Sequence, residues 1–186
     1  MPKKLELNSP LINLEQILLK LVLESAKKAG VKFSSHKSRA DIAEISLGVG
    51  AQRVLLIAAT LRCYMNESGG PTSSLANFFK VSNDHIIIAH DELDIPFQSI
   101  RLKFGGGDNG HNGLKSVTSG LSSPDYYRIR LGIGRPIGEQ DPADYVLKPF
   151  SSAERKDLDL FLQRGIDAVE LLITQGIEKA QNSFNK

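Results

Sequence analysis

Several common sequence features are missing from this 186-residue chain, and each absence makes one class of protein less consistent with the sequence. The only cysteine is Cys63, so an internal disulfide is impossible, which fits a reducing compartment. No apolar run is long enough to span a bilayer, and Glu6, Glu15 and Lys20 interrupt any signal-peptide core. We therefore expect a cytoplasmic protein with no membrane partner.

Motifs for metal binding and for several kinds of catalysis are also missing. The four histidines, at 36, 85, 90 and 111, are scattered, and one cysteine cannot build a thiolate site, so we expect neither metal nor cofactor. No Gly-x-Ser-x-Gly motif occurs. No Gly-Lys-Ser/Thr follows the glycine triplet 105–107, which excludes a P-loop. A mononucleotide-binding α/β domain is disfavoured because no glycine-rich loop follows an apolar first strand.

What is present is typical of a globular protein. Apolar residues make up 41% and charged residues 24% of the chain, and the length predicts one domain over residues 1–186, with an atypical N-terminus over 1–12. A net charge of +2 does not by itself indicate nucleic acid. The basic residues are instead concentrated locally, at Arg101, Lys103, Lys115, Arg128, Arg130 and Arg135. Such a local surface attracts a polyanion.

The hydrophobic periodicity predicts alternating helices and strands. Asn13 and Gln16 form a potential capping box before a helix that Gly30 ends. Strands are predicted over 40–47, 54–59, 86–89, 100–104 and 127–133, and further helices over 69–79, 113–121, 151–176 and 177–184. This order favours an α/β three-layer sandwich around a central, mostly parallel, twisted sheet.

Acidic residues follow the apolar strand 86–89 immediately. Asp91, Glu92 and Asp94 would lie beyond the carboxyl end of that strand, where open α/β sheets bind ligands. Asp91 is therefore a candidate to orient a histidine, bind a metal or act as a base. Solvated loop acids or helix caps explain the same pattern equally well.

Four further positions can serve recognition. Asn112 lies between glycines and offers both a donor and an acceptor for a carbonyl or a water, whereas its neighbour His111 is more readily explained as a brace for the loop than as a base. Tyr64 can stack on a base or sugar, or be a core aromatic beside a turn. Lys103 and Arg130 can grip phosphate, although a solvated sheet face is the commoner explanation for such a pair.

Six short motifs together identify a protein family more specifically than any one of them does alone. They are HDELDIP at 90–96, KFGGG at 103–107, GHNGLK at 110–115, RLGIGRP at 130–136, CYMNESG at 63–69 and DYVLKPF at 144–150. In this order and spacing the sequence resembles bacterial peptidyl-tRNA hydrolases, in a form similar to the actinobacterial one. The resemblance covers roughly residues 30–186.

The resemblance implies a carboxylic ester hydrolase that cleaves the ester between a peptide and the 3′ end of tRNA, and so recycles tRNA from aborted translation. It implies a metal-free cytoplasmic monomer whose partner is tRNA and not DNA. Asp91 would orient the catalytic histidine, Asn66 and Asn112 would hold the peptide or the attacking water, and Tyr64 would line the cleft. Lys103 and Arg130 would clamp the 5′-phosphate of the tRNA.

The sequence departs from the family at its start. The family begins with a strand, a Gly-x-x-Asn-Pro-Gly loop and a Thr-Arg-His-Asn segment that carries the general base. Here residues 1–12 read MPKKLELNSPLI, and no histidine precedes His36. Lys3–Leu7 is a possible replacement for the first strand. An alternative expectation is therefore a catalytically impaired family member that still binds tRNA.

Overall fold

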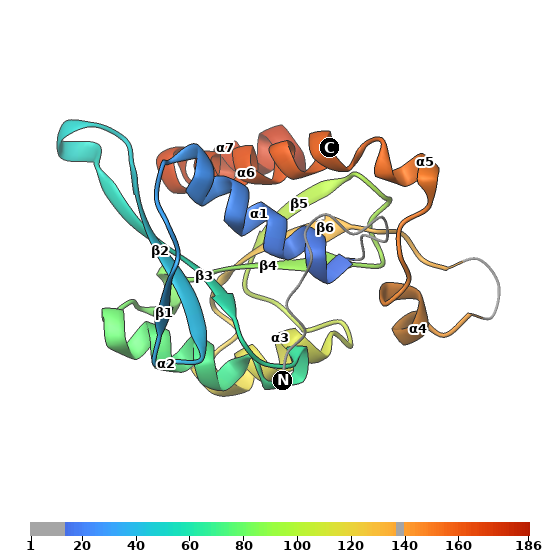
Figure 1. Ribbon diagram of the computed structural model, residues 1–186, viewed down its shortest axis with the longest axis horizontal. Helices are drawn as coiled ribbons and strands as arrows, with labels where there is room; N and C mark the ends of the chain where they lie inside the picture. The colour runs from blue at the N-terminus through green and yellow to red at the C-terminus, as the bar shows by residue number, and fades with distance from the viewer. Residues whose placement is uncertain (1–13, 137–139) are drawn as a thin grey trace. The chain divides into compact units, whose positions relative to one another are not determined.

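The computed structural model describes residues 14–136 and 140–186 (Figure 1). Contacts along the chain divide it into two compact units. Unit 1 contains Ala26–Ile88 and Lys103–Arg128. Among the described residues, unit 2 contains 14–25, Ala89–Leu102, 129–136 and 140–186. The single domain expected from the sequence stays a prediction.

Unit 1 contains a sheet of three strands, β1 (Ser34–His36), β2 (Ala40–Leu47) and β3 (Val54–Leu61), in that order. Both strand pairs are antiparallel, with Ala40 opposite Leu61 in the second pair. The expectation of a mostly parallel sheet is therefore wrong for these strands. The connections of a few residues explain the difference, because parallel neighbours need a crossover of a dozen residues or more.

Two helices of unit 1 pack through glycine. They are α2 (Gly69–Phe79) and α3 (Asn112–Leu121). A Cβ on Gly120 would lie 2.7 Å from the Gly69 Cα, which is too close for any side chain. The backbone N–H of Gly69 donates to Ser116 Oγ at 2.9 Å, so a side chain of α3 satisfies one of the first N–H groups of α2. The two helix backbones therefore approach closely, and the hydrogen bond fixes their position relative to each other.

A second sheet contains β4 (Ile87–Glu92), β6 (Tyr127–Gly132) and β5 (Ile100–Phe104), in that order. At Leu102 in β5, the backbone N–H donates to Asn185 Oδ1 at 2.7 Å, and the carbonyl accepts from Asn185 Nδ2 and Gln181 Nε2. Both amides come from the C-terminal segment that includes α7 (Ile177–Phe184). They satisfy backbone groups that an edge strand would otherwise expose.

Unit 2 buries its core beneath α6 (Leu158–Gln175). A Cβ on Gly165 would lie 2.6 Å from Leu21 Cδ1 of α1 (Leu14–Lys28) and 3.7 Å from Leu131 Cδ2, so a side chain here would require Leu21 to shift. Ser151 and Glu154 form the predicted capping box, but the helix that it opens, α5, is only Ser152–Arg155.

The sequence predicted most of these elements with small errors. The strands at 40–47 and 100–104 and the helix at 177–184 have the expected bounds. The helix predicted over 151–176 is wrong in one respect, because it is divided into α5 and α6. The short α4 (Pro142–Val146) was not predicted. The capping box at Asn13 and the possible strand at Lys3–Leu7 lie outside the described residues.

Candidate active site

The loop 105–110 in unit 1 adopts a conformation that depends on glycine. Gly105, Gly106 and Gly110 have φ of 63°, 101° and 80°, and Asn109 has φ of 46°. These values lie in the left-handed region that side chains other than Asn or Asp rarely adopt. A Cβ on Gly106 would also lie 2.7 Å from Lys103 Cε. The loop therefore leaves room for the Lys103 side chain to lie across Gly106.

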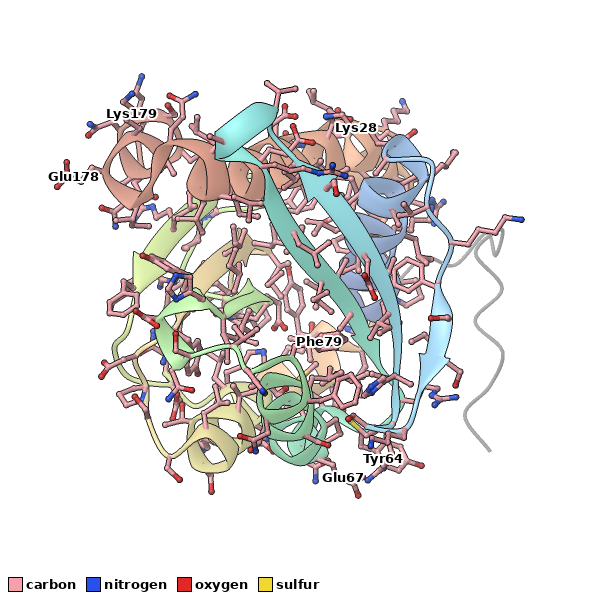
Figure 2. The ribbon with its side chains drawn as sticks, turned by 90° about the vertical axis from the view of Figure 1, so that its left-hand side faces the viewer. Lys28, Tyr64, Glu67, Phe79, Glu178 and Lys179 are labelled. Carbon is pink, nitrogen blue, oxygen red and sulfur yellow. The ribbon has the colours of Figure 1, made fainter. Side chains whose placement is uncertain are left out.

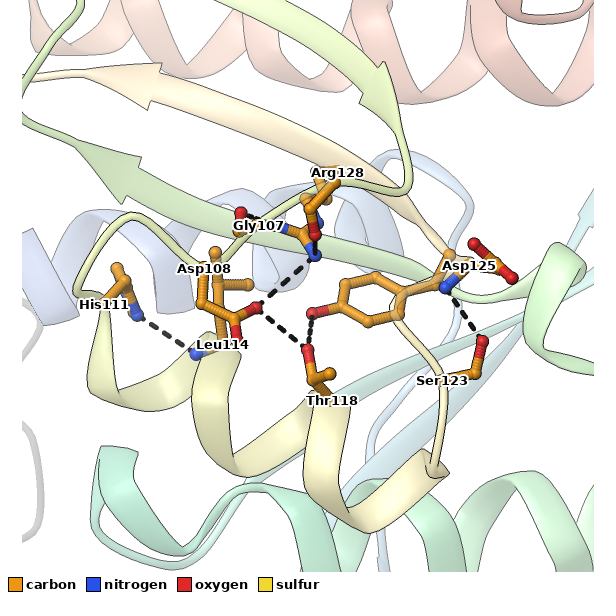
Figure 3. A network of polar contacts seen from close by, with 10 residues as sticks. Gly107, Asp108, His111, Leu114, Thr118, Ser123, Asp125 and Arg128 are labelled. Carbon is orange, nitrogen blue, oxygen red and sulfur yellow. Dashed lines mark hydrogen bonds and ion pairs between the residues drawn. The ribbon is translucent and has the colours of Figure 1, made fainter.

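His111 connects this loop to the start of α3. Its backbone N–H donates to the Asp108 carbonyl at 2.8 Å, and its Nδ1 accepts from the Leu114 N–H at 3.2 Å (Figure 3). His111 is thus the N-cap of α3, which fits the expectation that it braces the loop. Asn112, the first residue of the helix, is exposed.

The turn that contains Asn66 packs against the same helix end. A Cβ on Gly113 would lie 2.8 Å from Met65 Cγ, so the 65–67 turn and α3 meet closely at this glycine. Asn66 is exposed, and the Tyr64 side chain is 79% exposed; Figure 2 shows Tyr64 beside Glu67 on the outside of the fold. The alternative that Tyr64 is a core aromatic is therefore wrong. Three predicted substrate-binding residues come from adjoining segments of unit 1.

The acidic cluster belongs to unit 2, and two of its three residues are buried. Asp91 and Glu92 are the last two residues of β4 and each is 7% exposed, so the alternative of solvated loop acids is wrong for both. Glu92 Oε2 accepts from Arg130 Nη2 at 2.9 Å and from Nε at 3.1 Å. This ion pair explains how a buried carboxylate is tolerated. Asp94, at the surface, pairs with Arg135.

The two residues of the predicted phosphate clamp differ in their surroundings. Lys103 on β5 is exposed. The Arg130 side chain is only 20% exposed, and Glu92 compensates its charge. An anion approaching Arg130 therefore meets a guanidinium that is already oriented and partly neutralised, whereas Lys103 can offer a full positive charge. The two residues belong to different units.

Sequence reasoning missed the role of Arg128. Its spacing from Arg130 suggested a second basic residue on the same face, but Arg128 is 2% exposed. Its Nη1 donates to the Gly107 carbonyl at 2.5 Å and its Nη2 to the Gly106 carbonyl at 2.7 Å (Figure 3). The neighbouring glycine triplet was the one available signal, because its free carbonyls need donors.

The histidines have structural contacts at their Nδ1 atoms. His36 Nδ1 accepts from the Ser38 N–H, and its ring packs against Phe78 and Phe79. His90 Nδ1 donates to the Asp91 carbonyl at 2.6 Å, within the buried end of β4. His85 lies in an exposed turn, where hydrogen bonds from Ser82 and His85 lower the pKa of Asp84. With His111 capping α3, none of the four is placed by these contacts as the general base.

The site offers no sign of metal or thiolate chemistry among the described residues. No group of three His, Cys, Asp or Glu side chains in this part of the chain is arranged to hold a metal ion. Burial raises the pKa of the Cys63 thiol in spite of the nearby Arg39, so the neutral thiol is favoured over the nucleophilic thiolate. Across residues 14–136 and 140–186, no helix combines the length and apolar character required to cross a bilayer.

Comparison with known proteins decides the family. The family model described as peptidyl-tRNA hydrolase matches residues 17–186. The chain belongs to the peptidyl-tRNA hydrolase family. The peptidyl-tRNA hydrolase of Rhodococcus erythropolis is 56% identical over 161 residues, which cover 86% of this chain and 83% of that protein. That of Frankia alni is 52% identical over 160 residues, which cover 86% and 79%.

Solved structures confirm the fold. A crystal structure of the peptidyl-tRNA hydrolase from Acinetobacter baumannii superposes with a TM-score of 0.80 at 27% identity, covering 95% of this chain and 87% of that one. An Arg119Gln mutant of the enzyme from the same organism gives a TM-score of 0.79 at 28% identity, covering 90% and 83%. The predicted α/β class and the resemblance to this family are both confirmed.

Proposed function

We propose that this chain is a peptidyl-tRNA hydrolase, an enzyme that cleaves the ester between a peptide and tRNA. The observation that carries the proposal is the family match over residues 17–186, which includes every candidate site residue. The relatives that support it are about half identical over most of their length. The comparisons give no support to the alternative of a binding protein without hydrolase activity.

The recognition of the peptide ester is assigned to unit 1. Asn66 and Asn112 are exposed amides on adjoining segments, and each can donate to a carbonyl or orient a water. Asn112 is the first residue of α3, where the helix dipole favours the negative charge that develops on an ester carbonyl during hydrolysis. Tyr64, with its exposed ring, offers a surface for the substrate. We assign these three residues to substrate binding.

The recognition of tRNA is assigned to basic side chains. Lys103 is the better placed to attract a phosphate because it is exposed. Arg130 would contribute oriented hydrogen-bond donors more than net charge, because its guanidinium is already paired with Glu92. We further propose a cytoplasmic monomer that acts on tRNA and on neither DNA nor membranes.

Activation of the attacking water needs a general base. We propose that Asp91 orients this base and is not itself the base. An ordinary aspartate has a pKa of about 3.9 and is a poor base at neutral pH. The buried position of Asp91 at the end of β4 suits a carboxylate that orients another group.

Hydrolysis of N-acetyl-aminoacyl-tRNA by the purified chain tests the proposal. We expect release of the blocked amino acid, and much slower release from aminoacyl-tRNA with a free amine. tRNA binding is measured in parallel over a salt series. Binding without detectable hydrolysis would favour the impaired alternative, and absence of both would refute the function.

The phosphate assignment has a matched control on the same unit. Lys103→Ala is compared with Lys32→Ala, which removes an exposed lysine outside the candidate site. Loss of one phosphate contact is expected to lower the slope of log K against log salt by about one unit. Equal slopes for the two variants would remove Lys103 from the clamp.

A further inference from the structure

The buried arginine of unit 1 holds three successive residues of the glycine loop. In addition to its bonds to the carbonyls of Gly106 and Gly107, Arg128 Nη2 lies 3.5 Å from Asp108 Oδ1. The Tyr126 ring lies against the guanidinium, with its centroid 4.7 Å from Cζ. A charge buried to this extent is costly unless it is paired and hydrogen-bonded, as these contacts allow.

The loop has few other restraints between its ends. The Gly105 N–H donates to the Tyr126 carbonyl at 3.0 Å, and the Asp108 carbonyl accepts from His111. Between these points the chain passes through glycines that many backbone conformations would suit. The planar guanidinium fixes two adjacent carbonyls at once, which selects one of these conformations.

Asp108 extends the same restraint to α3. Its Oδ1 accepts from Thr118 Oγ1 at 2.9 Å, and the Tyr126 hydroxyl lies 3.0 Å from the same Thr118 oxygen (Figure 3). The loop is therefore tied to the first turn of α3 through His111 and to its second turn through Thr118. The position of Asn112 follows from these two contacts.

Two residues of the proposed site depend on this loop. Lys103 lies across Gly106, whose carbonyl Arg128 holds, and Asn112 starts the helix that Asp108 and His111 anchor. We propose that Arg128 is a positioning residue that sets the places of Lys103 and Asn112 together, and so couples phosphate binding to binding of the peptide ester. This inference rests on the proposed function of those two residues.

The variant Arg128→Lys tests the proposal with little change in volume or charge. A lysine ammonium is a point donor and cannot span two carbonyls as a guanidinium does. The control is Arg53→Lys, at an exposed arginine whose hydrogen bond goes to Ser46, outside the site. We expect Arg128→Lys to weaken tRNA binding by roughly tenfold, with a reduced salt slope, as for one lost phosphate contact. Turnover should fall through kcat by at most about two- to tenfold, as for loss of the Asn112 hydrogen bond to substrate.

A double variant separates positioning from general destabilisation. If Arg128 acts on tRNA through Lys103, then in a Lys103→Ala background Arg128→Lys should change tRNA affinity by less than about twofold. A merely structural role predicts the same tenfold loss in both backgrounds. That result, or unchanged binding in the single variant, would overturn the proposal.

Asp108→Asn provides a second test in case Arg128→Lys does not fold. It keeps the shape of the side chain but removes the charge that faces Arg128 and weakens the bond from Thr118. We expect a smaller loss in the same two assays, again absent for affinity in the Lys103→Ala background. If the parent chain neither binds nor hydrolyses, the proposed function itself fails; if the parent is active and these variants match it, only the positioning role fails.

Discussion

Substitution of Gly69 by alanine should destabilise unit 1, because this glycine lets α2 and α3 touch. A Cβ at this position would lie 2.7 Å from the carbonyl carbon of Ser116, and closer still to its oxygen. Ordinary contact between carbon atoms needs about 3.5–4.0 Å, so α3 would have to move by roughly 1 Å. Both clashing atoms are backbone, and no side-chain rotation relieves them.

The expected cost follows from three contributions. Overpacking costs about 1–3 kcal/mol, and loss of the Gly69 N–H bond to Ser116 Oγ adds about 0.5–1.5 kcal/mol. Replacing a helical glycine with alanine offsets about 0.5–1 kcal/mol. We expect a net destabilisation of about 0.5–4 kcal/mol, which lowers the melting temperature of a chain of this size by roughly 1–16 °C.

The neighbouring glycine is the matched control. A Cβ on Gly70 would meet no atom within 4 Å, so Gly70→Ala should be neutral or stabilise by up to about 1 kcal/mol. Thermal unfolding of both variants by calorimetry, with turnover measured below the transition, compares them directly. Gly69→Ala should also lose activity, because movement of α3 displaces Asn112. Two variants with equal stability would refute the close packing of α2 on α3.

Three further outcomes can be measured on the same chain. Asn112→Ala should lower turnover by about two- to tenfold, as expected for the loss of one hydrogen bond to substrate, and should leave the unfolding transition unchanged. Asn77→Ala, on the exposed side of α2, should change neither the turnover nor the unfolding transition. Burial raises the pKa of Tyr145. The contribution of the Tyr145 side chain to stability is therefore complete below about pH 10 and falls as the pH rises further. Above that pH the wild type should lose stability more steeply than Tyr145→Phe. If the two curves are parallel, Tyr145 is not the cause. Addition of an Asn-Pro-Gly turn and a Thr-Arg-His-Asn segment before Leu14 should raise the hydrolysis rate at least about a hundredfold, with a group titrating near pH 6.5, and full activity of the unaltered chain would contradict this expectation.

Local patterns predicted the elements well where one face of a strand or helix determines the structure. The alternation in 100–104 places Ile100 and Leu102 in the core at 0% and 1% exposure and Lys103 outside, as a half-buried strand requires. The break between α5 and α6 could not be predicted this way, because the amphipathic pattern continues across it. It coincides with Asp157, whose carboxylate accepts from Gln98 Nε2 at 2.8 Å, a contact between residues far apart in sequence.

The sequence nominated residues for the candidate site, whose roles stay predictions, but it did not reveal their electrostatics. The motifs identified Tyr64, Asn66 and Asn112, and the fold places them on adjoining segments of unit 1. The burial of Glu92 against Arg130 was not predictable, because an acidic run after an apolar strand looks the same whether it is solvated or paired. Only the folded chain shows that the Arg130 charge is compensated.

Arg128 and Arg130 show most clearly why spacing cannot assign roles to charged residues. The two arginines are separated by one residue of β6, share the same strand alternation and would be treated alike in any count of basic residues. Arg128 nevertheless donates to carbonyls of the loop 105–108, while Arg130 pairs with the carboxylate of Glu92. A buried arginine contributes little to attraction of a distant phosphate, since its field is directed at its own partners. The positive charge that this stretch presents is therefore smaller than the sequence suggests. We accordingly expect recognition of tRNA to depend more on the geometry of Lys103 and of the glycine loop than on total charge.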